Sequence, residues 1–423
     1  MSQTIAERIL SGKVGREVEP GEIVRVDYDL AASNDVSTPG TIAKFREMGA
    51  DRLADPDRVA IVPDHHVPSH DLAAQTQYTA CKEFAEAQGV EKFYPHSETG
   101  LMHAVLPDDG HVTPGDVVVG ADSHTTTYGA IGVFATGIGH TDLAFAWANG
   151  WTWLRVPESI RVDYEGVPPA FVRGKDLVLR TVGELGVDGA IYKSVEFTGE
   201  AVHALSIDDR FSMSNMILEA GAMAGMVDPD ERTAAYAEAQ PSEGYELFGA
   251  EEGADYVREL TVECSDMEPQ IAVPHLPENV TDLSAVEGVP VDQAVIGSCT
   301  NCRVEDLRQA ARILEGQSVD PDVRLIVTPG SREIESRAFE EGWMETFHRA
   351  GATLGSPGCG ACFGEHIGVL DEGEVAISTT NRNFLGRMGH DSSEVYLSNP
   401  SVAAASAVAG EITHPRDVLE GAA

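Results

Sequence analysis

The chain alternates short apolar runs with longer amphipathic stretches. The apolar runs are rich in Val, Ile and Ala, which is typical of strands buried on both faces of a parallel sheet. We expect buried strands at residues 59–63, 117–121, 291–296, 323–327 and 375–378. Further strands are expected at residues 23–28, 160–164 and 194–197.

The stretches between these runs place apolar residues at helical spacing. Helices are expected at residues 5–10, 41–48, 72–88, 141–149, 174–186, 215–224, 305–315, 333–350 and 399–410. The clearest is 72–88, because Asp71 is a suitable N-cap and Gly89 a suitable end. Strands alternating with helices predict an α/β fold with parallel sheets.

The character of the chain changes at two places, and we expect a domain boundary at each. One lies near residue 156, and the other follows a proline-containing linker at residues 274–290. Three α/β domains are therefore expected, with limits 1–156, 157–285 and 286–423. Residues 228–255 are acidic and poor in large aliphatic side chains, which indicates an exposed helical segment.

The charge of the chain is strongly one-sided. Asp and Glu number 69 against 29 Lys and Arg, giving a formal net charge of −40 that is spread along the sequence. Such a surface is typical of proteins that stay soluble in high salt, and it argues against nucleic acid and anionic membranes as partners. No secretory signal or membrane-length apolar run is visible. We therefore expect a soluble, cytoplasmic, halophilic protein.

The cysteines suggest a metal centre. Of the six cysteines, Cys299 follows a predicted strand, while Cys359 and Cys362 are separated by two residues in a loop rich in glycine. Two cysteines at this spacing can direct their sulfurs to one centre, and a third from a distant loop completes the set. Three thiolates fit an iron–sulfur cluster that leaves one iron open for chemistry.

The same cysteines are also compatible with a closed site of four thiolates. Cys302 follows Cys299 by three residues, so all four sulfurs could bind zinc or an electron-transfer cluster. The stretch between Cys302 and Cys359 is far longer than the roughly 15–20 residues usual between the halves of a zinc ribbon. Unrelated buried thiols fit a glycine-flanked pair poorly.

Acidic and imidazole groups follow two of the predicted strands. Asp64 and His65 come directly after the strand at 59–63, and Asp122, Ser123 and His124 come directly after the strand at 117–121. The ends of parallel strands are where open α/β sheets place their sites, although histidines near a turn more commonly lie on the surface without a function. A hydrolase triad is unsuited to three consecutive residues, because triad members converge from distant segments.

Two further sets of polar residues could be either functional or structural. Asn215 and Glu219 lie four apart, so a helix would project both from one face into apolar surroundings. Arg382 and Arg387 suit a bidentate grip on the carboxylates of a diacid or triacid. In so acidic a chain, an equal alternative is that these two arginines form surface ion pairs with acidic neighbours and bind no ligand.

Taken together, these motifs resemble those of the aconitase superfamily of iron–sulfur hydro-lyases, across residues 64–387. The matching stretches are residues 64–65, 120–125, 297–301, 358–364 and 381–387. The resemblance implies an aconitase-like fold of three α/β/α domains around a [4Fe–4S] cluster. It also implies that Cys299, Cys359 and Cys362 bind the cluster, whereas Cys302 stands where the family usually has another residue.

The resemblance further implies roles for the polar residues. Asp64 with His65 would donate a proton, and His103 with Asp122 and His124 with Glu219 would form two more acid–imidazole pairs. The implied contacts to the cluster or the substrate come from Ser123, Asn215, Asn301, Asn381, Arg382 and Arg387.

The chain ends where the family's fourth, swivel domain would begin. The resemblance therefore implies a separate small subunit that supplies a serine base and further arginines. It implies a hydro-lyase of leucine biosynthesis that isomerises 2-isopropylmalate to 3-isopropylmalate by dehydration and rehydration. A homoaconitase-type or other 2-hydroxy-diacid hydro-lyase is the nearest alternative. An RNA-binding form, as in some aconitase relatives, is disfavoured by the charge.

Overall fold

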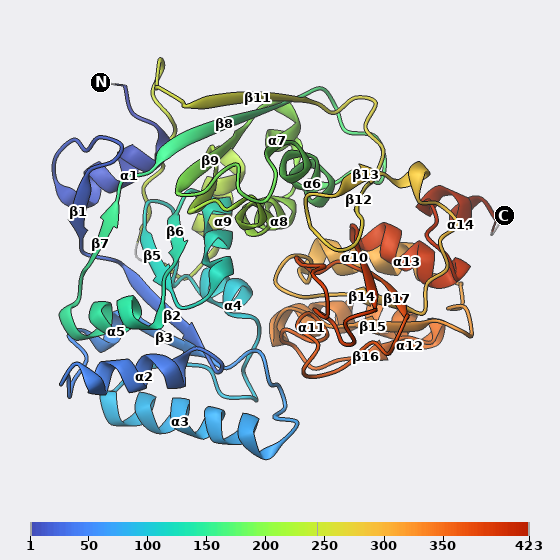
Figure 1. Ribbon diagram of the computed structural model, residues 1–423, viewed down its shortest axis with the longest axis horizontal. Helices are drawn as coiled ribbons and strands as arrows, with labels where there is room; N and C mark the ends of the chain where they lie inside the picture. Colours follow the sequence, from blue (N-terminus) through green and yellow to red (C-terminus); the bar gives the residue numbers. More distant parts are fainter. Residues whose placement is uncertain (1, 243, 422–423) are drawn as a thin grey trace.

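The computed structural model describes residues 2–242 and 244–421, which form three α/β units. In Figure 1 the first unit lies at lower left, the second along the top and the third on the right. Each unit is built on its own mainly parallel sheet, as the alternation of apolar runs and amphipathic stretches predicts. Among the described residues, no helix is long and apolar enough to span a membrane.

The first unit is a five-stranded parallel sheet with the strand order β4-β3-β2-β5-β6. Its strands are β2 (Leu30–Asn34), β3 (Val59–Val62), β4 (Lys92–Phe93), β5 (Val117–Gly120) and β6 (Phe134–Gly137). Its helices are α2 (Thr38–Glu47), η1 (Pro56–Arg58), α3 (Leu72–Gln88), α4 (Met102–Asp108), η2 (Ser123–Ile131) and α5 (His140–Asn149). The N-terminal α1 (Ile5–Val14) and the antiparallel pair β1 (Ile23–Val26) and β7 (Thr152–Arg155) lie beside it.

The second unit is a four-stranded parallel sheet with the order β10-β9-β8-β11. Its strands are β8 (Glu158–Glu165), β9 (Lys193–Thr198), β10 (Ala224–Val227) and β11 (Arg258–Glu263). Its helices are α6 (Gly174–Leu185), α7 (Glu200–Ala204), α8 (Ile207–Met216), η3 (Ile217–Ala220) and α9 (Glu231–Ala239).

The third unit is a seven-stranded mixed sheet with the order β13-β12-β18-β17-β14-β15-β16. Its strands are β12 (Gln270–Ala272), β13 (Val280–Asp282), β14 (Gln293–Ile296), β15 (Arg324–Val327), β16 (Thr353–Leu354), β17 (Val375–Ser378) and β18 (Glu394–Leu397). Its helices are η4 (Leu283–Ala285), α10 (Val304–Leu314), α11 (Arg332–Glu340), α12 (Trp343–Ala350), α13 (Pro400–Ala409) and α14 (Pro415–Gly421). β12 and β13 precede residue 286, so this sheet begins before the expected domain limit; the limits themselves remain predictions.

Local sequence signals explain several of these boundaries. The Asp71 side chain accepts a hydrogen bond from the Ala74 amide at 2.8 Å and caps α3, which spans the predicted residues 72–88. In the same way Asn399 caps α13, with Pro400 in the first turn. These caps satisfy amide groups that the helix itself leaves without partners.

Four sequence expectations for local structure were wrong. The helix expected at 215–224 lies earlier in the chain, because α8 already begins at Ile207, η3 stops at Ala220 and the chain then turns into β10. The helix expected at 333–350 is two helices, since Gly342 adopts a left-handed conformation between α11 and α12. The 274–290 linker contains β13 and η4, and the helical part of 228–255 is limited to α9.

The three units share buried contacts. One apolar cluster runs from the second sheet into the third, from Phe197 to Val295 and Leu397. Arg303 of the third unit forms ion pairs with Asp108 of the first unit and, at 2.8 Å, with Asp208 of the second. These contacts join the three units to one another.

Candidate active site

The site forms where the carboxyl ends of parallel strands in the first and third sheets meet. The turn after β3 carries Asp64, and its carbonyl accepts a hydrogen bond from the Cys359 amide at 2.8 Å. Gly358 permits this approach, because a Cβ there would stand 2.8 Å from the Asp64 carbonyl oxygen. The strand-end motifs of the two sheets are therefore neighbours in space.

The first acid–imidazole pair is Asp64 with His65. Their Oδ1 and Nδ1 atoms are 2.6 Å apart, and the second Asp64 oxygen accepts the Met102 amide at 2.8 Å. Burial alone would lower the pKa of His65, but the charge and hydrogen bond of Asp64, aided by Asp35, raise that pKa to about 10. The pair therefore holds a proton at neutral pH, as a proton donor must.

The second pair is His103 with Asp122, whose Nε2 and Oδ1 atoms are 3.1 Å apart. The Asp122 carboxylate also accepts the His124 amide at 2.7 Å and the Asn34 side-chain amide at 3.0 Å. Burial would raise the pKa of Asp122, but the His103 hydrogen bond and the nearby imidazoles hold it well below its usual range. Asp122 therefore stays ionised and orients the groups around it.

The third pair is His124 with Glu219, at 3.0 Å between Nε2 and Oε1. Arg382 donates to the same Glu219 oxygen at 2.9 Å and to Ser123 Oγ at 3.1 Å. Burial lowers the pKa of His124. Burial would raise the pKa of Glu219, but His124 and Arg382 lower it, so this group pairs a neutral imidazole with an ionised carboxylate.

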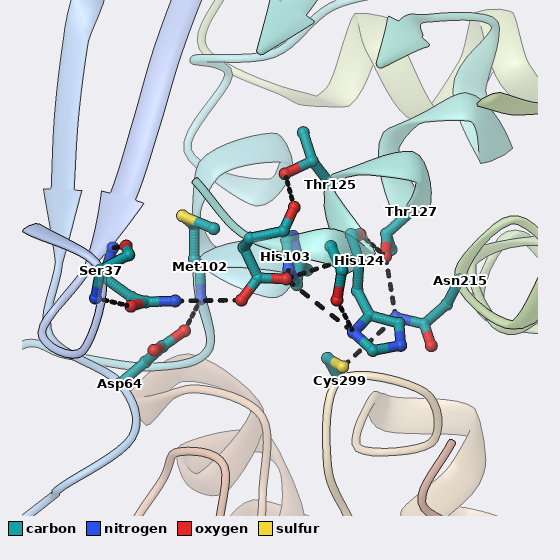
Figure 2. Close-up of polar contacts among 12 residues, drawn as sticks. Ser37, Asp64, Met102, His103, His124, Thr125, Thr127, Asn215 and Cys299 are labelled. Atoms are coloured by element: carbon teal, nitrogen blue, oxygen red, sulfur yellow. Dashed lines mark hydrogen bonds and ion pairs between the residues drawn. The ribbon is translucent and has the colours of Figure 1, made fainter. Parts of the chain in front are cut away.

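Hydrogen-bond donors surround the sulfurs of the predicted metal ligands. The side-chain amides of Asn215 and Asn381 donate to Cys299 Sγ at 3.3 and 3.2 Å. Figure 2 shows Asn215 reaching toward Cys299 near His124. Arg387 lies 3.6 Å from Cys362 Sγ. The hydrogen bond with Cys359, helped by Arg387 and opposed by burial, holds the pKa of Cys362 well below its usual range.

This donor set fits a thiolate-bound iron–sulfur cluster. Amide and guanidinium donors stabilise anionic sulfur, and such second-sphere hydrogen bonds are general at metal centres. Ser298, directly before Cys299, holds a left-handed backbone with φ of 66°, which is strained for a non-glycine residue and directs the following turn. Cys359 and Cys362 are buried.

A mononuclear zinc site fits less well. Among the described residues, Asp35, Asp64 and His65 form the one group of three or more His, Cys, Asp or Glu side chains whose ligand atoms all lie within 4.8 Å of one another, and this group contains no cysteine. Cys302 packs in the apolar core of the third unit against Gly330, where an added Cβ would stand 2.5 Å from its sulfur. Burial raises the pKa of the Cys302 thiol well above its usual range.

Asn301 occupies a supporting position. Its side-chain amide donates to Ser212 Oγ and Asp306 Oδ1, both at 2.9 Å, while its own buried Oδ1 has no partner among the described residues. The remaining residues predicted for the site all take part in the acid–imidazole pairs or in the contacts around the sulfurs.

The sequence reasoning missed Asn34 and Asp35. Asp35 is buried and accepts the backbone amides of residues 64, 65 and 66 at 3.1, 3.0 and 2.9 Å. Asn34 donates to the Asp122 carboxylate. The turn after β2 thus holds both neighbouring strand ends, and an Asn-Asp pair at a strand end would have been the signal.

A cavity of about 720 Å³ opens beside this edge and includes Asp122 and Ser123 in its wall. Trp153, Ile191 and Tyr192 also line it and are exposed. The cavity joins the polar strand ends to the surface of the first and second units.

Comparisons with known proteins give one consistent result. Residues 7–290 and 284–410 match the family described as "Aconitase family (aconitate hydratase)". The chain is 48% identical over 420 residues to the 3-isopropylmalate dehydratase large subunit of Halothermothrix orenii, covering 99% of this chain and 100% of the relative. It is 49% identical over 420 residues to large subunit 1 of the same enzyme from Pyrococcus furiosus, covering 99% of both chains.

One solved structure is also similar. The holo-form of Thermococcus kodakaraensis aconitase X aligns with 92% of this chain and 96% of its own, at 14% identity and a TM-score of 0.48.

Proposed function

The chain belongs to the aconitase family, and we infer that it is the large subunit of a 3-isopropylmalate dehydratase. The enzyme is a hydro-lyase that isomerises 2-isopropylmalate to 3-isopropylmalate in leucine biosynthesis. The observation that carries this conclusion is identity of 48–49% with such large subunits along nearly the whole of both chains. The alternative expected from the sequence, a homoaconitase-type enzyme, has the same chemistry and differs in the substrate side chain.

Cys299, Cys359 and Cys362 would hold the family's [4Fe–4S] cluster. When bound, that cluster supplies an iron without a thiolate ligand, which acts as a Lewis acid toward the substrate hydroxyl and a carboxylate. The side-chain amides of Asn215 and Asn381, at 3.3 and 3.2 Å from Cys299 Sγ, support this assignment because N–H donors stabilise the negative charge of a thiolate ligand.

The acid–imidazole groups would handle the proton of the leaving hydroxyl. His65, held by Asp64 at 2.6 Å and with a pKa of about 10, would donate that proton. Asp122 would orient the His103 imidazole and hold the backbone of His124 through its amide. In the return direction the same imidazole would take a proton from the water that adds.

Arginine and hydroxyl donors would bind the substrate carboxylates. Glu219 accepts a hydrogen bond from the Arg382 guanidinium, which also donates to the Ser123 hydroxyl. The guanidinium and the hydroxyl therefore lie side by side, where both could bind one substrate carboxylate. Arg387, next to Cys362, would hold the carboxylate nearer the cluster. Binding at fixed positions would align the hydroxyl with His65.

A small subunit would complete the site. The relatives are named as large subunits, so a smaller partner belongs to their enzyme. We propose that this partner forms a heterodimer-type complex and brings the base that removes the carbon-bound proton. Asp122 and Ser123 are open to the cavity, which leaves room for groups from outside this chain.

We also propose that the enzyme works in the cytoplasm of a halophilic cell. The net charge of −40 supports this, because dispersed acidic groups repel one another less when salt screens them. Lowering the salt concentration should lower the midpoint of thermal unfolding. A midpoint that is independent of salt would contradict the proposal.

The assay that tests the function is anaerobic reconstitution with iron and sulfide, with and without a candidate small subunit, on 2-isopropylmalate and homocitrate. We expect turnover of 2-isopropylmalate that requires both chains and iron. Preference for homocitrate would support the alternative substrate. An iron-loaded complex that is inactive on both would contradict the assignment.

A further inference from the structure

Lys175 is a fully buried lysine close to the candidate cluster site, and it lies outside the acid–imidazole pairs and the donors around the sulfurs. It lies in the first turn of α6, and its exposed fraction is 0%. Its ammonium donates to the carbonyl oxygens of Thr379 and Thr380 at 3.0 and 2.6 Å. These two residues follow β17 and directly precede Asn381, which donates to Cys299.

The ammonium has no carboxylate partner among the described residues. The two nearby acids are engaged elsewhere: Asp176 accepts the Gln270 amide at 2.8 Å, and Asp306 accepts the Asn301 side chain at 2.9 Å. Burial raises the pKa of Asp306 well above its usual range and that of Asp176 to about 6, so of the two acids Asp306 has the stronger tendency to be neutral. Burying a cation without a counter-charge costs free energy, so a group other than these two acids should supply the negative charge.

The turn that Lys175 holds leads directly to the sulfurs, because Thr380 precedes Asn381, whose side chain contacts Cys299 Sγ at 3.2 Å and Cys362 Sγ at 3.5 Å. Burial lowers the pKa of Lys175 to about 7, and negative charge on Cys299, followed by Asp306 and Cys362, opposes this lowering. Sulfurs bound to iron carry negative charge at all relevant pH values. The lysine is therefore placed to be charged when the site is loaded.

We propose that Lys175 is the counter-charge and positioning residue of the cluster held by Cys299, Cys359 and Cys362. This rests on the proposed function. The ammonium fixes the Thr379–Thr380 turn that presents Asn381, and its charge stabilises the cluster after it gains an electron. Charge and hydrogen bonds near a cluster set its reduction potential, so Lys175 should raise that potential.

The test compares reconstituted Lys175→Met and Lys175→Gln with the wild type in a potentiometric titration followed by electron paramagnetic resonance. Glutamine removes the charge but can still donate to the two carbonyls, so it separates charge from tethering. We expect both variants to lower the equilibrium constant for reduction at least tenfold, a shift of about 59 mV to more negative potential. Lys193→Met is the matched control, because Lys193 pairs at 3.1 Å with Glu158 and is partly exposed.

An unchanged potential in a cluster-loaded Lys175→Gln protein would overturn the proposal, as would an equal shift in Lys193→Met. If the variants do not fold, a second measurement on the wild-type enzyme still tests the proposal. Pulsed electron paramagnetic resonance of the reduced, ¹⁵N-lysine-labelled enzyme should show coupling to a lysine nitrogen, and absence of that coupling would also overturn the proposal. If the wild type itself binds no cluster, the proposed function fails instead.

Discussion

The carboxyl edges of the first and third sheets meet at one site but carry opposite kinds of group. The first edge pairs acids with imidazoles, as in Asp64 with His65 and Asp122 with His103. The third edge places donors around sulfurs, with Asn381 on Cys299 and Arg387 on Cys362. The first edge is therefore suited to holding and moving a proton, and the third to stabilising an anionic ligand set. Changing one edge should leave the other largely intact.

The largest expected effect comes from the third edge. Cys362→Ser should abolish both the retention of iron and turnover, because a serine hydroxyl is a poor substitute for a thiolate that Arg387 stabilises. Iron analysis and an activity assay of the reconstituted protein provide the measurement. Cys302→Ala is the matched control and should keep iron and activity. Equal iron loss in both variants would favour a site of four thiolates.

A smaller effect is expected from the first edge. Asp35→Asn removes the charge that faces three backbone amides of residues 64–66 and should displace His65. We expect kcat to fall about 10- to 100-fold, as is typical when a supporting hydrogen-bond partner is lost. Cluster content should not change. The exposed Asp27→Asn variant is the control, and a loss of iron in Asp35→Asn would show that the two edges are not separable.

The first edge should also give a pH-dependent difference in stability. The native pKa of His65, about 10, lies above its ordinary value of 6.5, so the folded protein binds this proton more tightly than the unfolded chain. The resulting stabilisation is fully present below pH 6.5 and is lost as the pH rises to about 10. The difference in free energy of unfolding between wild type and His65→Gln should therefore shrink over that window. Denaturant titrations at several pH values measure it, and a constant difference would argue against the raised pKa.

The two edges also differed in how well the sequence predicted them. Cys299, Cys359 and Cys362 were proposed as ligands because Cys359 and Cys362 share a loop rich in glycine and Cys299 follows a predicted strand, and the apolar runs ahead of Asp64 and Asp122 correctly predicted β3 and β5. The α/β class and the family resemblance are confirmed. The individual roles of the site residues remain predictions.

The part that could not be predicted centres on β2, which lies in the middle of the first sheet. Its sequence from Leu30 to Asn34 is mostly Ala, Ser and Asn, which have low strand propensity, yet all five residues are buried. Packing between neighbouring strands, rather than local preference, makes it a strand. Because the strand was missed, the Asn34–Asp35 turn was missed with it. Lys175 was missed because its carbonyl partners lie 204 and 205 positions away in the sequence.

The most direct test of the division between the edges is to measure iron content and turnover together in His65→Gln, reconstituted with the small subunit. We predict a full complement of cluster with a spectrum like that of the wild type, and kcat lower by about 10²- to 10⁴-fold, the usual contribution of a general acid. Loss of the cluster would mean that His65 supports the metal centre, and unchanged turnover would mean that the proton comes from elsewhere. Either result would contradict the account.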